Sequence, residues 1–404
     1  MTNFTSSFLK KPEIQRLLDS IGEGAATREH QRILPYEEID RIRAAQLGTL
    51  RIRVEDGGQG ESLRSVFELA IALGSVDANI AHILRNHFVF VDRYARNSPD
   101  GRHLGIARQI ADGAIVSLGS GEAQRNVVGG ETLRTALRPH QSGWLLTGHK
   151  YYTTGSLYSD LINVRAALPD GSPATIVIPT RRNGVEVIDD WDGVGQRLTS
   201  SGSVIFSDVE VNPEEVFADV RKHASEGNIP YASTYPQLYL TAVNAGILRN
   251  IQRDATELLK NRPHSFYYAP VPTPADDPLL QQTLGQIASA AFAAETIVLA
   301  AADALDAAYQ AREEGASQDE VATLAHTAAL RASHAKIIVD ELVIRAGAQL
   351  FDLGGASAAQ RERNLDRHWR NARTLAAHNP NSYKAQQIGA HLLHDTALPA
   401  TGFF

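Results

Sequence analysis

The stretch DRHWRNARTLAAHNPNSYK, from Asp366 to Lys384, is the most specific motif in the chain. It closes a region that begins near Tyr235, where long alanine-rich segments carry apolar residues at helical spacing. Inside this region, Ser317 and Glu320 have the spacing of a capping box. A helix from there to Phe351 would be roughly 50 Å long at 1.5 Å per residue. The pattern predicts a C-terminal bundle of long helices.

Upstream of the bundle, the period of the apolar residues changes to two, which is typical of strands. Turn signals at Ser142-Gly143, Asp170-Gly171 and Asn183-Gly184 separate the apolar runs. The strands we expect are Val116–Leu118, Gly143–Thr147, Leu161–Arg165 and Thr175–Ile178. This pattern predicts a central β domain over residues 114–225.

Helical spacing also marks the first part of the chain, from about Pro12 to Gly113. Pro35 ahead of two glutamates, and Asp77 ahead of an apolar run, are helix start signals. We therefore expect a helical domain at residues 1–113, the β domain at 114–225 and the bundle at 226–404. The aromatic and proline-rich stretch Arg262–Pro278 interrupts the bundle; it is a lid or interface loop, or a packed crossover without a role in binding.

Charge and composition narrow the classes of function. The 39 basic and 46 acidic residues give a net charge of -7, and no long Lys/Arg run is present, which argues against a nucleic-acid partner. Apolar stretches such as Ile297–Leu305 are interrupted by Asp303, and Met1–Lys11 lacks the order of a secretory signal. We expect a globular cytoplasmic protein without a membrane partner.

Sulfur is almost absent from the sequence. There is no Cys, and Met1 is the only Met. Disulfides, thiolate metal sites and thiol nucleophiles are therefore excluded, and no metal site is expected. Loss of every internal Met has no folding rationale, because Met packs well in cores. Chance or lineage bias is one explanation; synthesis of the protein under sulfur limitation is the other, and it points to sulfur acquisition.

Helices, then a β domain, then a helical bundle is the order of the acyl-CoA dehydrogenase superfamily, and local motifs agree with it. The segments that are similar to motifs of that family are Val54–Gly60, Ala72–Ala81, Leu146–Gly155, Gln349 with Gly354-Gly355, and Arg370–Arg373. The resemblance implies an N-terminal helical domain, a β-barrel-like domain and a C-terminal four-helix bundle.

The motif from Asp366 to Lys384, with Asp189-Asp190-Trp191, Gly195-Gln196-Arg197 and Ser201-Gly202-Ser203, most resembles the flavin monooxygenase branch of that superfamily. This branch includes dibenzothiophene monooxygenase and sulfur-scavenging relatives such as methanesulfinate monooxygenase. The resemblance implies FMN as cofactor, received as FMNH2 from a separate NAD(P)H:FMN reductase. It also implies O2 and a small organosulfur compound as substrates, and a homotetramer.

The residues themselves disfavour a dehydrogenase. Removal of an α-proton requires a carboxylate base, which that family places after the Arg370–Arg373 segment. Here residues 376–380 read Ala-Ala-His-Asn-Pro and contain no acid, and residues 235–250, the other place used by relatives, contain none either. With dehydrogenation disfavoured, the remaining reaction type is oxygenation, in which the flavin performs the difficult step.

By the same resemblance, His378 takes the place of a catalytic histidine, and it belongs to the residue type that titrates near neutrality. His87 matches a second active-site histidine of the branch, and Thr154 is the hydroxyl that would hydrogen-bond the flavin ring. For each of these residues a purely structural role is the alternative. The resemblance also implies that the cofactor contacts Ser120, Thr154, Trp191, Ser201, Ser203, Arg262, Gln349, Gly354, Gly355, Trp369, Arg370 and Asn371.

Two departures from the branch, Leu118 in place of an Asn and Leu375 in place of a His, suggest a substrate other than a bulky thiophene. The first hypothesis is a monooxygenase of an alkanesulfinate, sulfone or sulfide, with methanesulfinate favoured. The second is a flavin-dependent N-hydroxylase on the same fold. The third is a noncatalytic flavin-binding or DNA-binding relative, and its DNA-binding form would need a basic patch.

Overall fold

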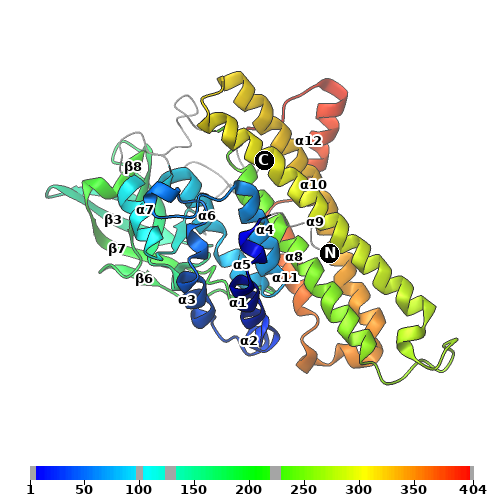
Figure 1. The fold of residues 1–404 in the computed structure, drawn as a ribbon. Coiled ribbons are helices and arrows are strands. Elements are labelled where there is room, and N and C mark those ends of the chain that lie inside the picture. Colours follow the sequence, from blue (N-terminus) through cyan, green and yellow to red (C-terminus); the bar gives the residue numbers. More distant parts are fainter. Residues whose placement is uncertain (1–5, 97–102, 123–132, 219–228, 401–404) are drawn as a thin grey trace.

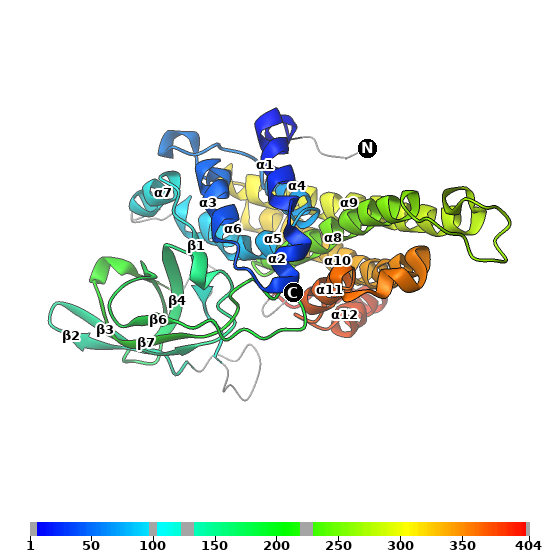
Figure 2. The ribbon, with the colours of Figure 1, turned by 90° about the horizontal axis from the view of Figure 1, so that it is seen from below.

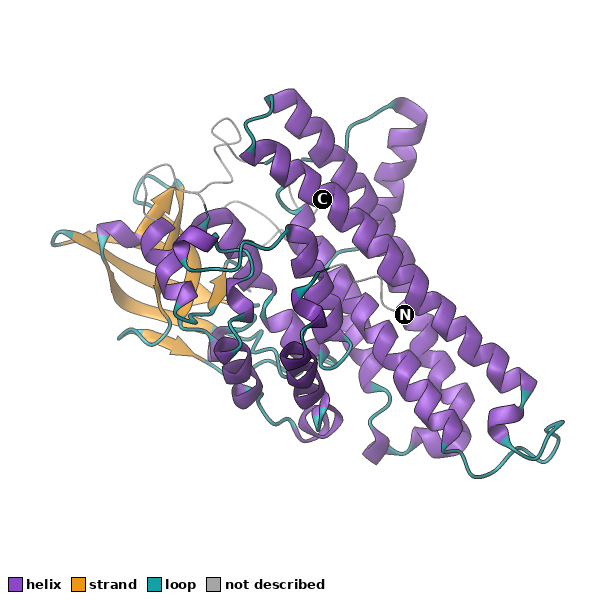
Figure 3. Cartoon of the chain, viewed as in Figure 1, coloured by secondary structure: helices purple, strands orange, loops and turns teal. Residues whose placement is uncertain are grey.

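Helices flank a single sheet along the chain. The computed structural model describes residues 6–96, 103–122, 133–218 and 229–400. The sheet lies at one end, the long helices extend away at the other, and the N-terminal helices lie between them (Figures 1 and 3). This arrangement confirms the expected fold class, with its helical, β and helical regions.

The N-terminal region is helical. Its helices are α1 (Pro12–Gly22), α2 (Ala25–Gln31), α3 (Tyr36–Ala44), α4 (Leu63–Gly74), α5 (Ala78–Ile83), α6 (Arg85–Phe90) and α7 (His103–Ala111). Asp77 caps α5 by accepting the N–H of Asn79 at 3.0 Å, as its position ahead of the apolar run predicts. Pro35 precedes α3 at its N-cap.

The central sheet has eight strands in the order β6-β7-β3-β2-β4-β5-β8, and β1 pairs in parallel with β4. The strands are β1 (Val116–Gly119), β2 (Ala136–His140), β3 (Gly143–Lys150), β4 (Leu161–Ala167), β5 (Pro173–Pro179), β6 (Val185–Val187), β7 (Val204–Val211) and β8 (Val216–Ala218). The expected boundary at residues 225/226 lies outside the described residues.

Three long helices form the C-terminal bundle: α8 (Thr234–Lys260), α9 (Pro278–Glu313) and α10 (Gln318–Gly354). The fourth side is filled by two shorter helices, α11 (Arg367–Ala376) and α12 (Asn381–His394), which lie beside α10 in Figure 2. The two are separated at Pro380, which disfavours helical backbone in the residue before it. Ser317 caps α10 through the N–H of Glu320 at 3.2 Å, as expected.

Helix α9 is long and apolar enough to cross a membrane by length and composition, contrary to our expectation that no stretch reaches that size. However, 56% of its most apolar window is buried inside the protein, as in a bundle core helix. Its alanines pack against α8 and α10, so α9 contributes to the same hydrophobic core as the N-terminal helices.

Helix α8 connects the bundle to the N-terminal helices. Gly246 of α8 lies so close to α4 that a Cβ there would come within 2.5 Å of the Ile71 carbonyl oxygen and 2.7 Å of the Cα of Gly74. Only glycine permits this approach. The close contact brings α5 and α6, which follow α4, next to α8 and to the sheet. The candidate site lies at this junction.

Candidate active site

The loop of residues 188–203, between β6 and β7, joins the sheet to the bundle. Gln196 and Ser200 have φ angles of 54° and 50°, a left-handed conformation that costs energy in non-glycine residues and is concentrated at functional sites. The N–H of Gln196 donates to Asn371 Oδ1 of α11 at 2.6 Å. Its carbonyl accepts from Nε1 of Trp191 at 2.8 Å. Two predicted site residues, Trp191 and Asn371, therefore meet at Gln196.

The side chain of Gln196 is completely buried. Its Oε1 lies 3.1 Å from Nδ1 of His82 on α5, and an amide oxygen can only accept, so Nδ1 of His82 carries a proton. Among the described residues, Nε2 of Gln196 has no hydrogen-bond partner. A buried donor left without a partner is rare in folded proteins and indicates a place for a ligand.

A chain of hydroxyl groups lies where β3 ends. Thr154 Oγ1 is 2.7 Å from Ser201 Oγ, and Ser201 Oγ is 2.8 Å from Thr199 Oγ1. The carbonyl of Thr154 accepts from Asn86 Nδ2 of α6 at 3.5 Å. Thr154 and Ser201 are 5% and 4% exposed, so these hydroxyls lie inside the protein. The structure thus brings together two predicted flavin contacts that are 47 residues apart.

His378 follows α11 and faces Arg85, the first residue of α6. Arg85 Nη1 lies 3.3 Å from His378 Nε2, which accepts because a guanidinium can only donate. Although the residue His378 is exposed in part, desolvation by the surrounding protein lowers the pKa of its ring well below 6.5, and the positive charges of Arg85 and Lys336 lower it further. Our expectation of titration near neutrality is therefore wrong, because desolvation and the neighbouring cations both favour the neutral ring.

The charged groups around Arg85 and His378 are mainly cations. The charges of Arg85 and Lys336 both lower the pKa of His378. Among the described residues, no Asp or Glu forms an ion pair with Arg85, and none contributes to its pKa. The arrangement can hold a neutral histidine and several hydrogen-bond donors beside a ligand, but it offers no acid residue to remove an α-proton.

Comparisons with known proteins agree with this geometry. Residues 238–383 match the family model described as the acyl-CoA dehydrogenase C-terminal domain. FMN-bound TdsC from Paenibacillus sp. A11-2 superposes with a TM-score of 0.84 and is 29% identical, over 96% of this chain and 99% of that one. This chain has the acyl-CoA dehydrogenase fold.

Two curated relatives extend along almost the whole chain. Dibenzothiophene monooxygenase of Mycolicibacterium goodii is 27% identical over 91% of this chain and 89% of its own length. The probable FMNH2-dependent monooxygenase SfnC of Pseudomonas putida is 26% identical over 96% of each. The resemblance to the monooxygenase branch of the acyl-CoA dehydrogenase superfamily is thus confirmed.

His87, the second expected catalytic histidine, is held by backbone on both sides of its ring. Its Nε2 is 2.8 Å from the Gly48 carbonyl, and its Nδ1 accepts the N–H of Val116 at 3.2 Å. Its side chain is completely buried, and burial lowers its pKa to about 4. These contacts join the N-terminal helices to β1 and leave neither ring nitrogen available to a ligand.

Ser203 and Ser120 differ in their surroundings. The hydroxyl and the N–H of Ser203 both donate to the carboxylate of Asp190, each at 2.7 Å, and this anion does not favour a phosphate at Ser203. Ser120 follows β1 and is half-buried. The adjacent Gly121 carbonyl accepts the N–H of Tyr151 at 3.0 Å, so Ser120 lies beside the stretch that carries Thr154.

On α11, Arg370 is bound by carboxylates. It donates to Glu29 of α2 at 2.5 Å and to Asp366 at 2.7 Å. Burial raises the pKa of Glu29, but hydrogen bonds from Arg370 and Asn364 and the charge of Arg370 outweigh it, and the pKa is lowered. Arg370 therefore holds α11 against the N-terminal helices. Trp369 is 38% exposed and packs beside Gly347 of α10.

The other predicted cofactor contacts form a second group. Arg262 Nη1 donates to the Leu353 carbonyl at 2.6 Å, next to Gly354 and Gly355. Gln349, one turn earlier on α10, donates to Gln286 of α9 at 2.9 Å. Lys336, which contacts the Ala376 carbonyl near His378, lies 17 residues before Leu353 on α10. At 1.5 Å per residue, Lys336 and Leu353 are roughly 25 Å apart along α10.

Sequence reasoning missed His82 and Arg85. Their spacing of three residues, with an intervening Leu84, places both on one side of a helical segment. Two basic residues close together in a buried helical segment were the available signal. Gln196 belonged to a quoted motif but was not chosen, since its buried amide and missing partner become evident only in three dimensions.

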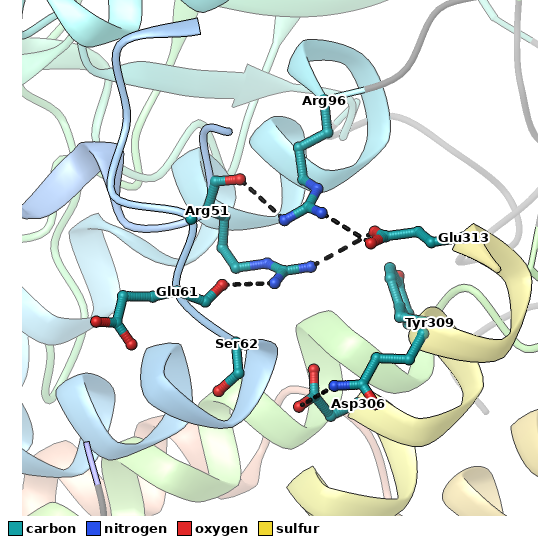
Figure 4. Close-up of a pocket in the computed structure, with 9 residues that line it drawn as sticks. Arg51, Glu61, Ser62, Arg96, Asp306, Tyr309 and Glu313 are labelled. Carbon is teal, nitrogen blue, oxygen red and sulfur yellow. Dashed lines mark hydrogen bonds and ion pairs between the residues drawn. The ribbon is translucent and has the colours of Figure 1, made fainter. Parts of the chain in front are cut away.

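A cavity of about 210 Å³ lies elsewhere, between the start of α4 and the end of α9 (Figure 4). Arg51 and Arg96 reach into it, and Glu313 lies 3.9 Å and 2.8 Å from their nitrogens. Arg51 also pairs with the buried Asp92 at 2.8 Å. These charges neutralise one another, so the cavity joins α9 to the N-terminal helices and is separate from the group around His378.

Proposed function

We propose that this protein is the oxygenase component of a two-component flavin monooxygenase. It would receive FMNH2 from a separate NAD(P)H:FMN reductase in the cytoplasm and transfer one oxygen atom of O2 to a small organosulfur compound. The observation that carries this proposal is a histidine beside an arginine, without a carboxylate, at the place where the resembling dehydrogenases carry their base.

The residues at the junction suit a flavin. Gln196 Nε2 is a buried donor without a partner among the described residues. The Thr154 and Ser201 hydroxyls are linked to the Gln196 carbonyl through Thr199, which donates to that carbonyl at 2.8 Å. Trp191 is half-buried, and its indole is fixed by the Gln196 carbonyl. These groups would hold the polar edge and one face of the ring. Bound reduced flavin supplies the electrons and activates O2.

The protein then has two tasks. Buried side chains around Thr154 and Ser201 keep water from the reacting atoms, which limits the loss of oxidising equivalents as hydrogen peroxide. His378 manages a proton: because Nε2 accepts from Arg85, the neutral ring carries its proton on Nδ1. That N–H can donate a hydrogen bond to an oxygen atom at the reacting centre at neutral pH.

For the substrate, we favour an alkanesulfinate, sulfone or sulfide, with methanesulfinate as the leading individual. The sulfur-poor composition suits a protein made when sulfur is scarce. The names of the relatives in the comparisons also refer to organosulfur substrates or to FMNH2.

We further propose a homotetramer. Arg262 and the Gly354-Gly355 turn lie at the end of α10, roughly 25 Å along the helix from Lys336, which contacts the Ala376 carbonyl near His378. In a homotetramer, a second copy would bring such a group to the FMN phosphate. Exposed apolar side chains on the bundle, Leu279, Phe292, Leu392 and Leu393, are 63–78% exposed and suit such contacts. Sedimentation analysis would contradict the proposal if it found a monomer that binds FMN.

The direct test supplies FMNH2 through a reductase in air and screens sulfinates, sulfones, sulfides and amines. A substrate should give an oxygenated product and suppress hydrogen peroxide release. Oxidation of amines alone would support N-hydroxylation. Turnover of an acyl-CoA, with none of these compounds oxygenated, would overturn the proposal, and flavin binding without any turnover would indicate a noncatalytic relative.

A further inference from the structure

Within the part of the chain that the structure describes, Arg85 is a buried cation without a balancing anion. Arg85 is only 9% exposed to solvent. Its Nε lies 3.4 Å from Asn86 Oδ1 and its Nη1 3.3 Å from His378 Nε2, so both of its partners are neutral. Its Nη2 makes no hydrogen bond among the described residues. Burial lowers its pKa to about 10, a value at which it remains charged at neutral pH.

Other arginines that are equally buried show what is missing. Arg28 pairs with Glu38 and Asp77 at 3.1 Å, and Arg51 pairs with Asp92 at 2.8 Å. A buried charge that lacks such a partner costs several kcal/mol of desolvation. Carboxylates of the protein thus balance the charges of Arg28 and Arg51. The charge of Arg85 would be balanced by a bound ligand.

The side chains around Arg85 also favour an anion. The charge of Arg85 contributes to the low pKa of His82, and Lys336 adds positive potential at His378 although it pairs with Asp340 at 2.6 Å. The Gln196 amide binds His82 through its Oε1, and its buried Nε2 has no acceptor in the described ranges. Hydrogen-bond donors and an excess of positive charge are thus both present around Arg85.

Arg85 also lies between the two parts of the proposed site. Its neighbour Asn86 accepts from Arg85 and donates to the carbonyl of Thr154. On the opposite side Arg85 contacts His378. An anion bound to the guanidinium would therefore lie between the hydroxyl groups proposed for the flavin and the histidine proposed to manage the proton.

We propose that Arg85 binds the oxyanion group of the substrate, and that the substrate is therefore a short-chain organic anion, an alkanesulfinate, and not a neutral sulfide, sulfone or thiophene. This inference rests on the proposed monooxygenase function. Planar guanidinium groups match the paired oxygens of such an anion.

The chemistry keeps the charge constant. In the reaction R-SO2⁻ + O2 + FMNH2 → R-SO3⁻ + FMN + H2O, an S–O bond forms and the O–O bond breaks. Sulfur loses two electrons, and the flavin supplies the two that reduce the second oxygen atom to water. Substrate and product carry the same negative charge, so Arg85 binds both about equally, and its loss should raise KM more than it lowers kcat.

The test uses the protein loaded with oxidised FMN and two probes of similar size, methanesulfonate and dimethyl sulfone, measured by titration calorimetry. Wild-type protein should bind the anion at least about 30-fold more tightly than the neutral sulfone. Arg85→Gln should weaken methanesulfonate binding about 100-fold and leave sulfone binding unchanged, whereas Arg85→Lys should retain most of the affinity.

Stability of the ligand-free protein provides a second measurement. Arg85→Gln removes an uncompensated buried charge and should raise Tm, whereas the matched control Arg51→Gln strands Asp92 and should lower it. A fall of Tm in Arg85→Gln as large as that in Arg51→Gln would show that the fold already balances Arg85, and would overturn the inference.

Other outcomes separate the inference from the proposed function. If Arg85→Gln loses FMN affinity and keeps methanesulfonate affinity, the anion served by Arg85 belongs to the flavin and the inference is wrong. If the wild-type enzyme oxygenates dimethyl sulfone and does not bind methanesulfonate, the monooxygenase stands and the inference falls. If methanesulfonate binds through Arg85 but no sulfur compound is oxygenated, the monooxygenase proposal fails, while the anion site of Arg85 stands.

Discussion

Acidification should destabilise this protein through its buried histidines, and His87 offers the clearest measurement. Its ring is completely buried between two backbone groups, and its pKa is lowered from 6.5 to about 4. Below pH 6.5 the unfolded chain therefore binds a proton that the native state does not. The free energy of unfolding should fall as the pH drops from 6.5 towards 4, and His87 should contribute no further loss below that range.

The magnitude follows from 1.36 kcal/mol per pKa unit. At pH 5 the unfolded histidine lies about 1.5 units below its own pKa, while the native ring is still mostly neutral, so His87 alone should cost about 2 kcal/mol relative to pH 8. His82 and His368, with pKa values lowered to about 3 and about 4 mainly by burial, act in the same direction. Together they amount to much of the stability of an ordinary domain.

The variant His87→Gln isolates the contribution of His87 protonation to the pH dependence of stability. The glutamine amide can still donate to the Gly48 carbonyl, but Val116 loses its acceptor, so the variant should be about 1–3 kcal/mol less stable than wild type at pH 8. At pH 5 this difference should shrink by about 2 kcal/mol. Urea denaturation of the flavin-free protein, followed by circular dichroism, measures both values.

The range from pH 7.5 to 9 is the internal control, because His87 is neutral there in both states and the difference should stay constant. An unchanged difference between pH 8 and pH 5 would refute the reasoning, since it would mean that His87 takes up its proton equally well in the folded protein.

Further predictions concern the proposed site. His378→Ala should bind FMN normally but form product about 100-fold more slowly, with more hydrogen peroxide released; an unaffected product yield would remove His378 from the mechanism. Ser201→Ala should weaken FMN binding roughly 5- to 10-fold, whereas Ser203→Ala should leave it within about 2-fold, because Asp190 already occupies that hydroxyl; fluorescence titration of FMN compares the pair. Asn371→Ala removes the acceptor of the Gln196 N–H, and calorimetry should show a loss of about 1–3 kcal/mol of stability; an unchanged Tm would mean that the loop does not depend on this contact.

Local signals in the sequence were sufficient for most of the fold. The Ser317 cap, the Asp77 cap and the change of period near residue 114 reflect interactions within a few residues of each other, which is why they can be read along the chain. Strands β2, β6, β7 and β8 were not anticipated. Strands β6 and β8 have only three residues each, too few to show a period; β2 and β7 are longer. Their burial patterns alternate poorly or carry a bulge opposite β3, so a period of two is obscured.

The site was accessible only in part. The motif at Asp366–Lys384 and the absence of an acid near His378 pointed to the right region and against dehydrogenation. Whether a residue type is available to a ligand depends, however, on its neighbours. Ser203 is bound by Asp190, and His87 by two backbone groups, although both have the residue type that the chemistry requires.

The sequence by itself determined the class of the fold, the order of its parts and the family of chemistry, because these depend on local propensities and on motifs that are contiguous in the chain. Tertiary structure alone decided that Arg85 contacts His378 across 293 residues and that, of the residues the structure describes, none accepts from Gln196 Nε2 and no carboxylate pairs with Arg85. The cost of burying a charge depends on what packs around it, and no spacing along a chain records those neighbours.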